Sequence, residues 1–186
     1  MANRNTQGFG LIPAGTLGQT PATSGQGKYK IVAGYGTTIY QGGAVASSAG
    51  YIIDGQTTDA PILGVLNGIF FNAATTLKPT FQNHYVQVTP ANSEDIDAFV
   101  FDNPQQQYVV ATDATVAQAG FLETYDMNTS AGSTTTGKSS STLDIGDTSA
   151  DAAAFRLLRS AEDPENDENA SFRSVVVCLN LIELQS

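Results

Sequence analysis

The apolar residues of this chain come in short runs separated by clusters of Gly, Ser, Thr, Asn and Pro. The main runs cover residues 28–33, 37–40, 44–46, 51–53, 62–71, 84–88, 96–101, 107–111, 154–159 and 172–184. Short runs rich in Val, Ile, Tyr and Phe, bounded by turn residues and spaced by about ten residues, are typical of β-sandwiches and barrels. We therefore predict an all-β fold, either an antiparallel β-barrel or a sandwich.

Small polar residues replace charge in this chain. Thr, Ser and Gly make up 53 of the 186 residues, and charged residues only 14%, against about 25% in an average soluble protein. The length suits a single domain, since domains most often have about 100–150 residues. We predict one β-rich domain over residues 28–186, preceded by an extended N-terminal arm over residues 1–27.

The final run, residues 172–184, is apolar on both alternating faces. Such a strand is expected at the centre of a sheet, with both faces covered. We expect the following side chains to be buried: Val175, Val177, Leu179, Ile62, Val65 and Phe99.

Two segments lack the pattern of a core. Residues 1–27 are rich in Gly, contain Pro13 and Pro21, and show no period of 2 or 3.6. A segment of this kind cannot bury enough of itself to offset its ordering entropy, so we expect a partner or the body to order it. Residues 128–150 hold 15 Ser, Thr or Gly among 23 residues. We expect a long surface excursion there, with one edge strand at residues 141–143.

The charge of the chain is strongly acidic and unevenly placed. The formal net charge is −10, which argues against nucleic acid as a direct partner, because phosphate binding needs clustered Lys and Arg. Residues 1–53 contain no acidic residue and carry +3, from Arg4, Lys28 and Lys30, whereas the remainder carries −13. This division suggests that the two parts of the chain face different surroundings.

Membrane insertion and secretion are not indicated by the sequence. No apolar run approaches the ~20 residues of a membrane span, and no apolar stretch follows Arg4 as in a signal peptide. The single cysteine, Cys178, excludes an internal disulfide. We expect a soluble protein that is made in the cytosol.

The sequence offers little catalytic chemistry. His84 is the only histidine, and Cys178 lies among Val and Leu, where a thiol is inert. The acidic stretch 162–168 lacks the spacing of a calcium-binding loop, so a solvated loop is expected. A pair of glycosidase carboxylates stays open among residues 94–97, although the chain has no Trp for sugar stacking. We predict no enzymatic activity, no cofactor and no metal.

A series of short motifs follows in a defined order along the chain. These motifs are Gly8-Phe-Gly-Leu11 with Pro13, Tyr29-Lys-Ile31, Gly34-Tyr35, Ile39-Tyr-Gln-Gly42, Ile62-Leu-Gly-Val65, Lys78-Pro-Thr-Phe81, Ala98-Phe-Val100, Asp102-Asn-Pro104 and Asp163-Pro-Glu-Asn166. Their order, over residues 8–182, resembles the short virion proteins of tailed bacteriophages that decorate or cement the capsid. The family often ends in an Asn-Asn-His-like tail, where this chain has Cys178-Leu-Asn-Leu-Ile182.

The resemblance implies a structural function without catalysis. It implies a virion protein that is made in the host cytoplasm, binds the outer surface of the major capsid protein lattice and stabilises the phage head. It further implies self-association as a trimer, with a dimer as the alternative, and contact with neither nucleic acid nor membrane.

The acid-free arm is our candidate for the capsid contact. The candidate capsid-binding residues are Arg4, Phe9, Leu11, Ile12, Pro13 and Leu17 in the arm, and Lys28 and Lys30 directly after it. Three other functions stay open from sequence: a tail or receptor-binding virion protein, a secreted carbohydrate-binding domain, and a small hydrolase.

Overall fold

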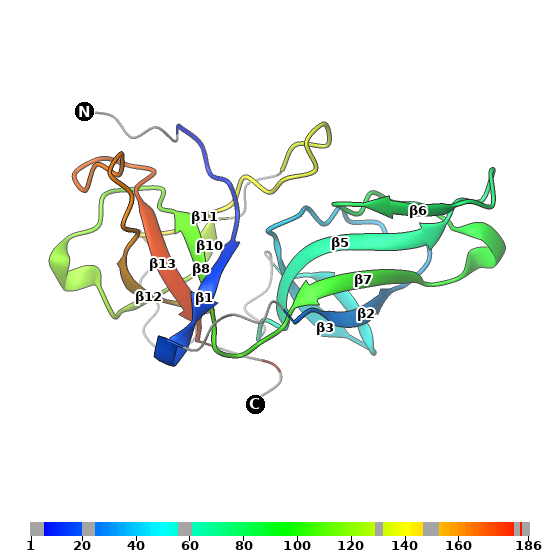
Figure 1. The fold of residues 1–186 in the computed structure, drawn as a ribbon, viewed down its shortest axis with the longest axis horizontal. Coiled ribbons are helices and arrows are strands. Elements are labelled where there is room, and N and C mark those ends of the chain that lie inside the picture. The colour runs from blue at the N-terminus through cyan, green and yellow to red at the C-terminus, as the bar shows by residue number, and fades with distance from the viewer. Residues whose placement is uncertain are drawn as a thin grey trace.

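The computed structural model describes residues 6–19, 25–55, 61–128, 132–146, 153–180 and 183. The described chain is all-β with antiparallel sheets, as predicted, and its helical content consists of three short 3₁₀ turns. Figure 1 shows two groups of strands that lie side by side along the long axis of the molecule. We call them the terminal lobe (β1 and β8–β13) and the inserted lobe (β2–β7).

The terminal lobe contains a five-stranded sheet in the order β1-β8-β13-β12-β9 and a two-stranded sheet, β10-β11. The strands are β1 (Ile12–Thr16), β8 (Gln106–Ala111), β9 (Thr124–Tyr125), β10 (Met127–Asn128), β11 (Thr142–Leu143), β12 (Phe155–Ser160) and β13 (Ser174–Leu179). All six residues of β13 are buried. The predicted central strand at the C-terminal end is therefore confirmed, although it is shorter than the apolar run that indicated it.

The inserted lobe contains a six-stranded sheet in the order β2-β7-β5-β3-β4, with β6 paired to the far half of β5. Its strands are β2 (Gly27–Ile31), β3 (Ala44–Ser48), β4 (Tyr51–Asp54), β5 (Gly64–Asn72), β6 (Pro79–Gln82) and β7 (Ile96–Phe101). The two ends of this order, β2 and β4, lie close to each other. The sheet is thus curled around its own core.

The path of the chain joins the lobes in an unusual way. β1 pairs with β8 in the terminal lobe, yet β2 to β7 lie between them in sequence. The inserted lobe is therefore one continuous stretch of chain, placed between two neighbouring strands of the other sheet. β7 passes directly into β8 through the turn at residues 102–105.

The buried apolar residues form two clusters. One fills the terminal lobe and includes Ile62 and Val65 of the inserted lobe, and the other lies within the inserted lobe. Val175, Val177, Leu179, Ile62 and Val65 are each at most 5% exposed, as predicted. Phe99 is only half-buried, so its predicted burial is wrong. Alternation along β7 turns Ala98 and Val100 to the core and Phe99 to the opposite face.

Two of the predicted strands are reduced to a single pair of residues. The runs at residues 37–40 and 84–88 meet only at Ile39 and Tyr85, which exchange two backbone hydrogen bonds of 3.0 and 2.8 Å. Beyond this pair the chains separate, because Gln41 bonds instead to Gly137 and Ser139 in the Ser/Thr/Gly-rich segment.

The Ser/Thr/Gly-rich segment is only partly a surface excursion. Residues 133–136 are exposed, but Ser139 and residues 141–143 are buried, so the predicted exposure is wrong for that part. The reason is that the segment pairs with Gln41 of the inserted lobe and with β10, and Leu143 joins the core. The edge strand predicted at residues 141–143 is present as β11.

Candidate docking cleft between the two lobes

Residues 12–16 of the predicted arm form a strand of the protein's own sheet. β1 pairs antiparallel with β8, with Ile12 opposite Val109 and Thr16 opposite Gln106. A bulge at Ala14 interrupts the pairing, and the Gln106 side-chain amide donates a 2.7 Å hydrogen bond to the Gly15 carbonyl. The body of the protein therefore orders this part of the arm, which is one of the two possibilities left open by the sequence, and β8 occupies one edge of the strand.

Residues 8–11 are held in a narrow passage between the lobes. The Gly10 amide donates to the Ser141 carbonyl at 3.2 Å, and the Leu11 amide donates to the Gly42 carbonyl at 2.8 Å. Gly10 has φ +73°, and a Cβ on Gly8 would lie 2.0 Å from the Ser140 carbonyl oxygen. Glycine is required here, because no larger residue fits so close to a neighbouring backbone.

An apolar cleft of about 230 Å³ opens where this segment crosses the junction of the lobes. Its lining residues are Phe9, Leu11, Ile12, Pro13, Gln41, Gly42, Val65, Leu66, Asn67, Phe101 and Lys138. Four of the eight predicted capsid-binding residues (Phe9, Leu11, Ile12 and Pro13) therefore meet at one site. Both lobes contribute to it, since Val65 and Leu66 come from β5.

The polar groups of the cleft are few. The Gln41 amide donates a 3.1 Å hydrogen bond to the Asn67 side-chain oxygen, so these two amides are fixed against each other. Lys138 is exposed and is the only charged side chain in the lining. Within the described part of the chain it makes no ion pair. The cleft thus combines an apolar floor with one exposed cation, Lys138, at its edge.

The predicted contact residues differ in their exposure. Leu11 is 1% exposed and belongs to the core of the terminal lobe. Ile12 is 51% and Leu17 37% exposed. Ile12 and Leu17 can therefore contact a partner, whereas Leu11 is a buried core residue at the bottom of the cleft.

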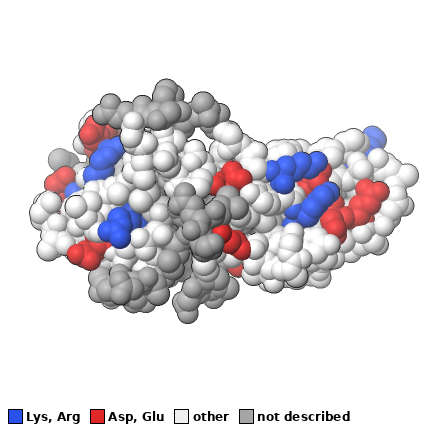
Figure 2. Space-filling model, turned by 90° about the horizontal axis from the view of Figure 1, so that it is seen from below, with Lys and Arg blue, Asp and Glu red and all other residues white. Residues whose placement is uncertain are grey.

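Lys28 and Lys30 lie elsewhere, on β2 of the inserted lobe. Their ammonium groups contact the Asp97 carboxylate at 2.8 and 2.6 Å. Burial would raise the pKa of Asp97, but the hydrogen bonds from both lysines outweigh it and lower this pKa. The hydrogen bond to Asp97 raises the pKa of Lys30. Figure 2 shows basic and acidic atoms close together over this lobe.

The predicted set is therefore divided between two places. The structure does not bring Lys28 and Lys30 to the cleft, and Arg4 lies outside the described residues. Sequence reasoning missed Gln41, Asn67, Phe101 and Lys138. No local signal marks these four residues, because they come from four separate segments that meet only in the folded chain.

The other candidates from the sequence, His84 and Cys178, lie in different lobes. The ring of His84 stacks on Tyr40 at 6.1 Å between centroids, and its Nδ1 lies 2.9 Å from the Asn83 side-chain oxygen. Cys178 is 6% exposed, and burial raises the pKa of its thiol. Among the described residues, no three His, Cys, Asp or Glu side chains converge as metal ligands would.

Two residues, Asn166 and Arg173, organise the acidic loop between β12 and β13. Asn166 exchanges two hydrogen bonds with the Ser174 backbone, at 2.8 and 2.9 Å. Arg173 is 4% exposed, pairs with Glu168 at 3.2 Å and lies over the Phe121 ring. Most of the carboxylates point into solvent, as expected for a solvated loop.

None of the described helical segments has the length and apolar character that a membrane-spanning helix needs. Comparisons with protein-family models, with curated proteins and with solved structures found no match to this chain.

Proposed function

We propose that this protein decorates the capsid of a tailed bacteriophage, binding the outer surface of the major capsid protein lattice through the cleft between its lobes. The proposal rests on the ordered motifs that resemble such virion proteins. One structural observation supports it most: Phe9, Leu11, Ile12 and Pro13 line a single apolar cleft, and Ile12 is 51% exposed there. The protein would be made in the host cytoplasm, reside on the virion and act without catalysis or cofactor.

The dimensions of the cleft fit a side chain better than a small-molecule substrate. At about 230 Å³ it is below the roughly 300–1,000 Å³ of typical ligand pockets. Burial of one Leu or Phe side chain from the capsid protein would contribute about 1.5–3 kcal/mol. A carboxylate next to that side chain would pair with Lys138, and this smaller contribution would weaken with salt.

Many weak contacts suffice for this function. A decoration protein binds a repeated lattice. If its copies also touch each other, their overall affinity for the lattice is higher than that of a single contact, because neighbouring copies are held at a high effective concentration. Association of copies as trimers on the lattice stays part of this proposal, on the strength of the resemblance.

Capsids isolated without this protein provide the test. We expect the wild type to saturate them, and Ile12→Asp to weaken binding at least about tenfold, because the change places a charge in an apolar contact. Leu122→Asp is the matched control: Leu122 is 62% exposed, but it lies in the terminal lobe away from the cleft lining. Saturation by Ile12→Asp at unchanged affinity would refute the proposed contact.

A further inference from the structure

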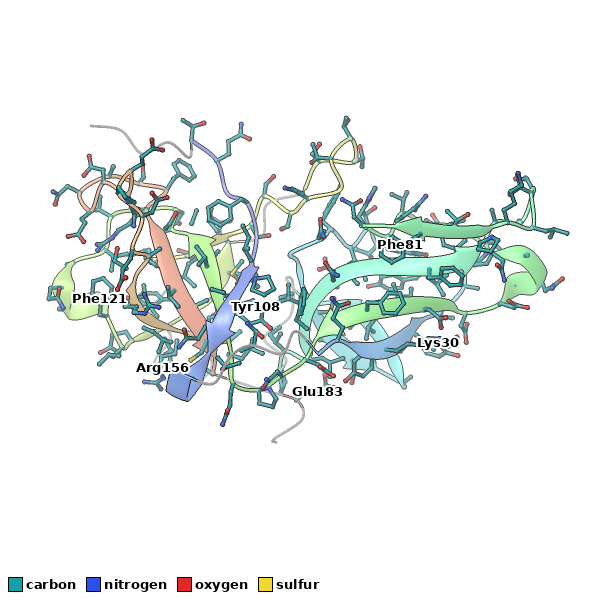
Figure 3. All side chains as sticks on the ribbon, viewed as in Figure 1. Lys30, Phe81, Tyr108, Phe121, Arg156 and Glu183 are labelled. Atoms are coloured by element: carbon teal, nitrogen blue, oxygen red, sulfur yellow. The ribbon has the colours of Figure 1, made fainter. Side chains whose placement is uncertain are left out.

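A second depression, of about 310 Å³, lies on the inserted lobe where β5 ends and β7 begins. Its lining residues are Lys30, Phe70, Phe71, Asn72, Pro90, Glu94, Asp95 and Asp97. None of them lines the apolar cleft between the lobes. Figure 3 shows one of them, Lys30, on the inserted lobe and apart from Tyr108 of the terminal lobe. The depression contains the carboxylates of residues 94–97, for which the sequence left a glycosidase pair open.

The register of the strands brings these side chains together on one face of the sheet. Lys30 of β2 and Phe70 of β5 are both cross-strand partners of Asp97 in β7, so the three residues form one row. Asn72 lies two positions beyond Phe70, and Asp95 two positions before Asp97. Because side chains alternate along a strand, Asn72 and Asp95 continue the same face in the next row.

Two of the carboxylates are held in place by other parts of the protein. Asp97 contacts the ammonium groups of Lys28 and Lys30 at 2.8 and 2.6 Å. Asp95 accepts a 3.0 Å hydrogen bond from the Tyr51 hydroxyl. Since an ionised carboxylate can accept about four hydrogen bonds, each of the two is fixed in position and keeps acceptor sites for a ligand.

Two further polar side chains of the depression are available to a ligand. The Glu94 carboxylate and the Asn72 amide make no hydrogen bond or ion pair within the described part of the chain. Phe70 adds a half-buried aromatic ring beside them. The depression therefore offers acceptors on its carboxylates, donors on Lys30 and Asn72, and one apolar wall.

This combination of groups points to a neutral ligand rich in hydroxyl groups. Three carboxylates disfavour an anion, and among the described residues no three side chains converge as metal ligands would. A hydroxyl group both donates and accepts, so it can bond to the carboxylates as well as to Lys30 and Asn72. The C–H face of a sugar ring packs on an aromatic ring such as Phe70. We infer that this depression, which reaches the roughly 300 Å³ of the smallest ligand pockets, binds a saccharide unit.

The arrangement suits binding and not cleavage of the sugar. Burial would raise the pKa of Asp97, but the hydrogen bonds from Lys28 and Lys30 lower it. A glycosidase needs a carboxylic acid whose pKa is raised, so that it can protonate the leaving group. Asp97 instead stays ionised and accepts hydrogen bonds. The inference does not depend on the proposed capsid binding, because the two sites share no lining residue.

Titration of the purified, ¹⁵N-labelled protein with single sugars, followed by two-dimensional NMR, tests the inference. The probes are glucose, galactose, mannose and N-acetylglucosamine, each up to about 100 mM, because an open depression that contacts one face of a sugar binds weakly. We expect at least one sugar to shift the amide signals around the depression in a saturable manner. Glu94→Ala and Asn72→Ala should each weaken this binding at least about fivefold, through the loss of a hydrogen bond. Glu162→Ala is the matched control, since Glu162 is an exposed loop glutamate of the terminal lobe.

Each of the other outcomes overturns the inference. The absence of a saturable shift with all four sugars shows that the depression binds none of them. Shifts with spermidine or inorganic phosphate, but with no sugar, assign the depression to an ion. Sugar-induced shifts that persist in both variants place the sugar elsewhere. The spectrum of each variant shows directly whether it is folded, and Asn72→Ala replaces Glu94→Ala if that variant is not.

Discussion

The two lobes differ in how they cover their sheets. In the terminal lobe, all six residues of the central strand β13 are buried. In the inserted lobe, β7 buries only alternate residues, and Asp97, Phe99 and Phe101 stay partly exposed on the outer face. The comparison indicates that the central strand of the terminal lobe is covered on both faces, whereas the sheet of the inserted lobe leaves aromatic side chains partly exposed on one face.

The largest expected effect comes from comparing a buried phenylalanine of the terminal lobe with an exposed one of the inserted lobe. Phe155, in β12 of the terminal lobe, is 0% exposed. Phe155→Ala should lower the free energy of unfolding by about 3–5 kcal/mol through lost burial and a cavity. Phe81→Ala, measured by urea denaturation at low protein concentration, should cost less than about 1 kcal/mol. Equal losses for the two variants would contradict the division between covered and uncovered faces.

The second effect concerns the passage that ties the two lobes together. Gly10→Ala should destabilise the protein by about 1–3 kcal/mol, because φ is +73° and the new Cβ would lie 2.8 Å from the Gly42 carbonyl oxygen. Gly15→Ala is the control, since nothing lies within 4 Å of a Cβ there. Denaturant midpoints measure both. If Gly10→Ala and Gly15→Ala had the same denaturant midpoint, the close approach of residues 8–11 to the two lobes would not contribute to stability.

A smaller effect concerns the ion pairs of Asp97 in the inserted lobe and their dependence on pH. The pKa of Asp97 is lower in the folded chain than in the unfolded one, so its ion pairs stabilise the fold above the unfolded pKa. This contribution is lost as the pH falls through the lowered folded pKa. Asp97→Asn should therefore reduce the drop in unfolding free energy between pH 6 and pH 3, by less than about 1 kcal/mol because the pair is near solvent. An unchanged drop would exclude this role for Asp97.

The smallest effect is expected in the acidic loop of the terminal lobe. Glu162 lies 3.9 Å from Arg159, and its side chain is 93% exposed. Glu162→Gln should change the free energy of unfolding by less than about 0.5 kcal/mol. A larger loss, measured by the same urea titration, would show that this loop has a structural role that its exposure does not suggest.

The sequence predicted the strands whose pattern is local. Alternation and β-branched residues located β7, β8 and β13 and indicated an all-β fold. For the arm, the sequence left open whether a partner or the body orders it. Nothing within residues 12–16 shows that β8, ninety or more positions away, is their partner.

The candidate site was only half predictable for a similar reason. Isolated apolar residues in a charge-poor segment pointed to Phe9, Leu11, Ile12 and Pro13, which line the cleft, and also to Leu17, which does not. Lys138 and Gln41 could not be found, because they reach the cleft through a long-range pairing of two loops. Lys28 and Lys30 were grouped with the arm by sequence proximity, but β2 carries them into the other lobe to Asp97.

The most direct measurement of the central claim is a cryo-EM reconstruction of virions that carry this protein. We expect the cleft between the lobes to face the shell, with a capsid-protein side chain between Phe9, Ile12 and Phe101 and an acidic group near Lys138. A reconstruction in which the cleft opens to solvent while the protein is held on the shell by other surfaces would contradict this expectation.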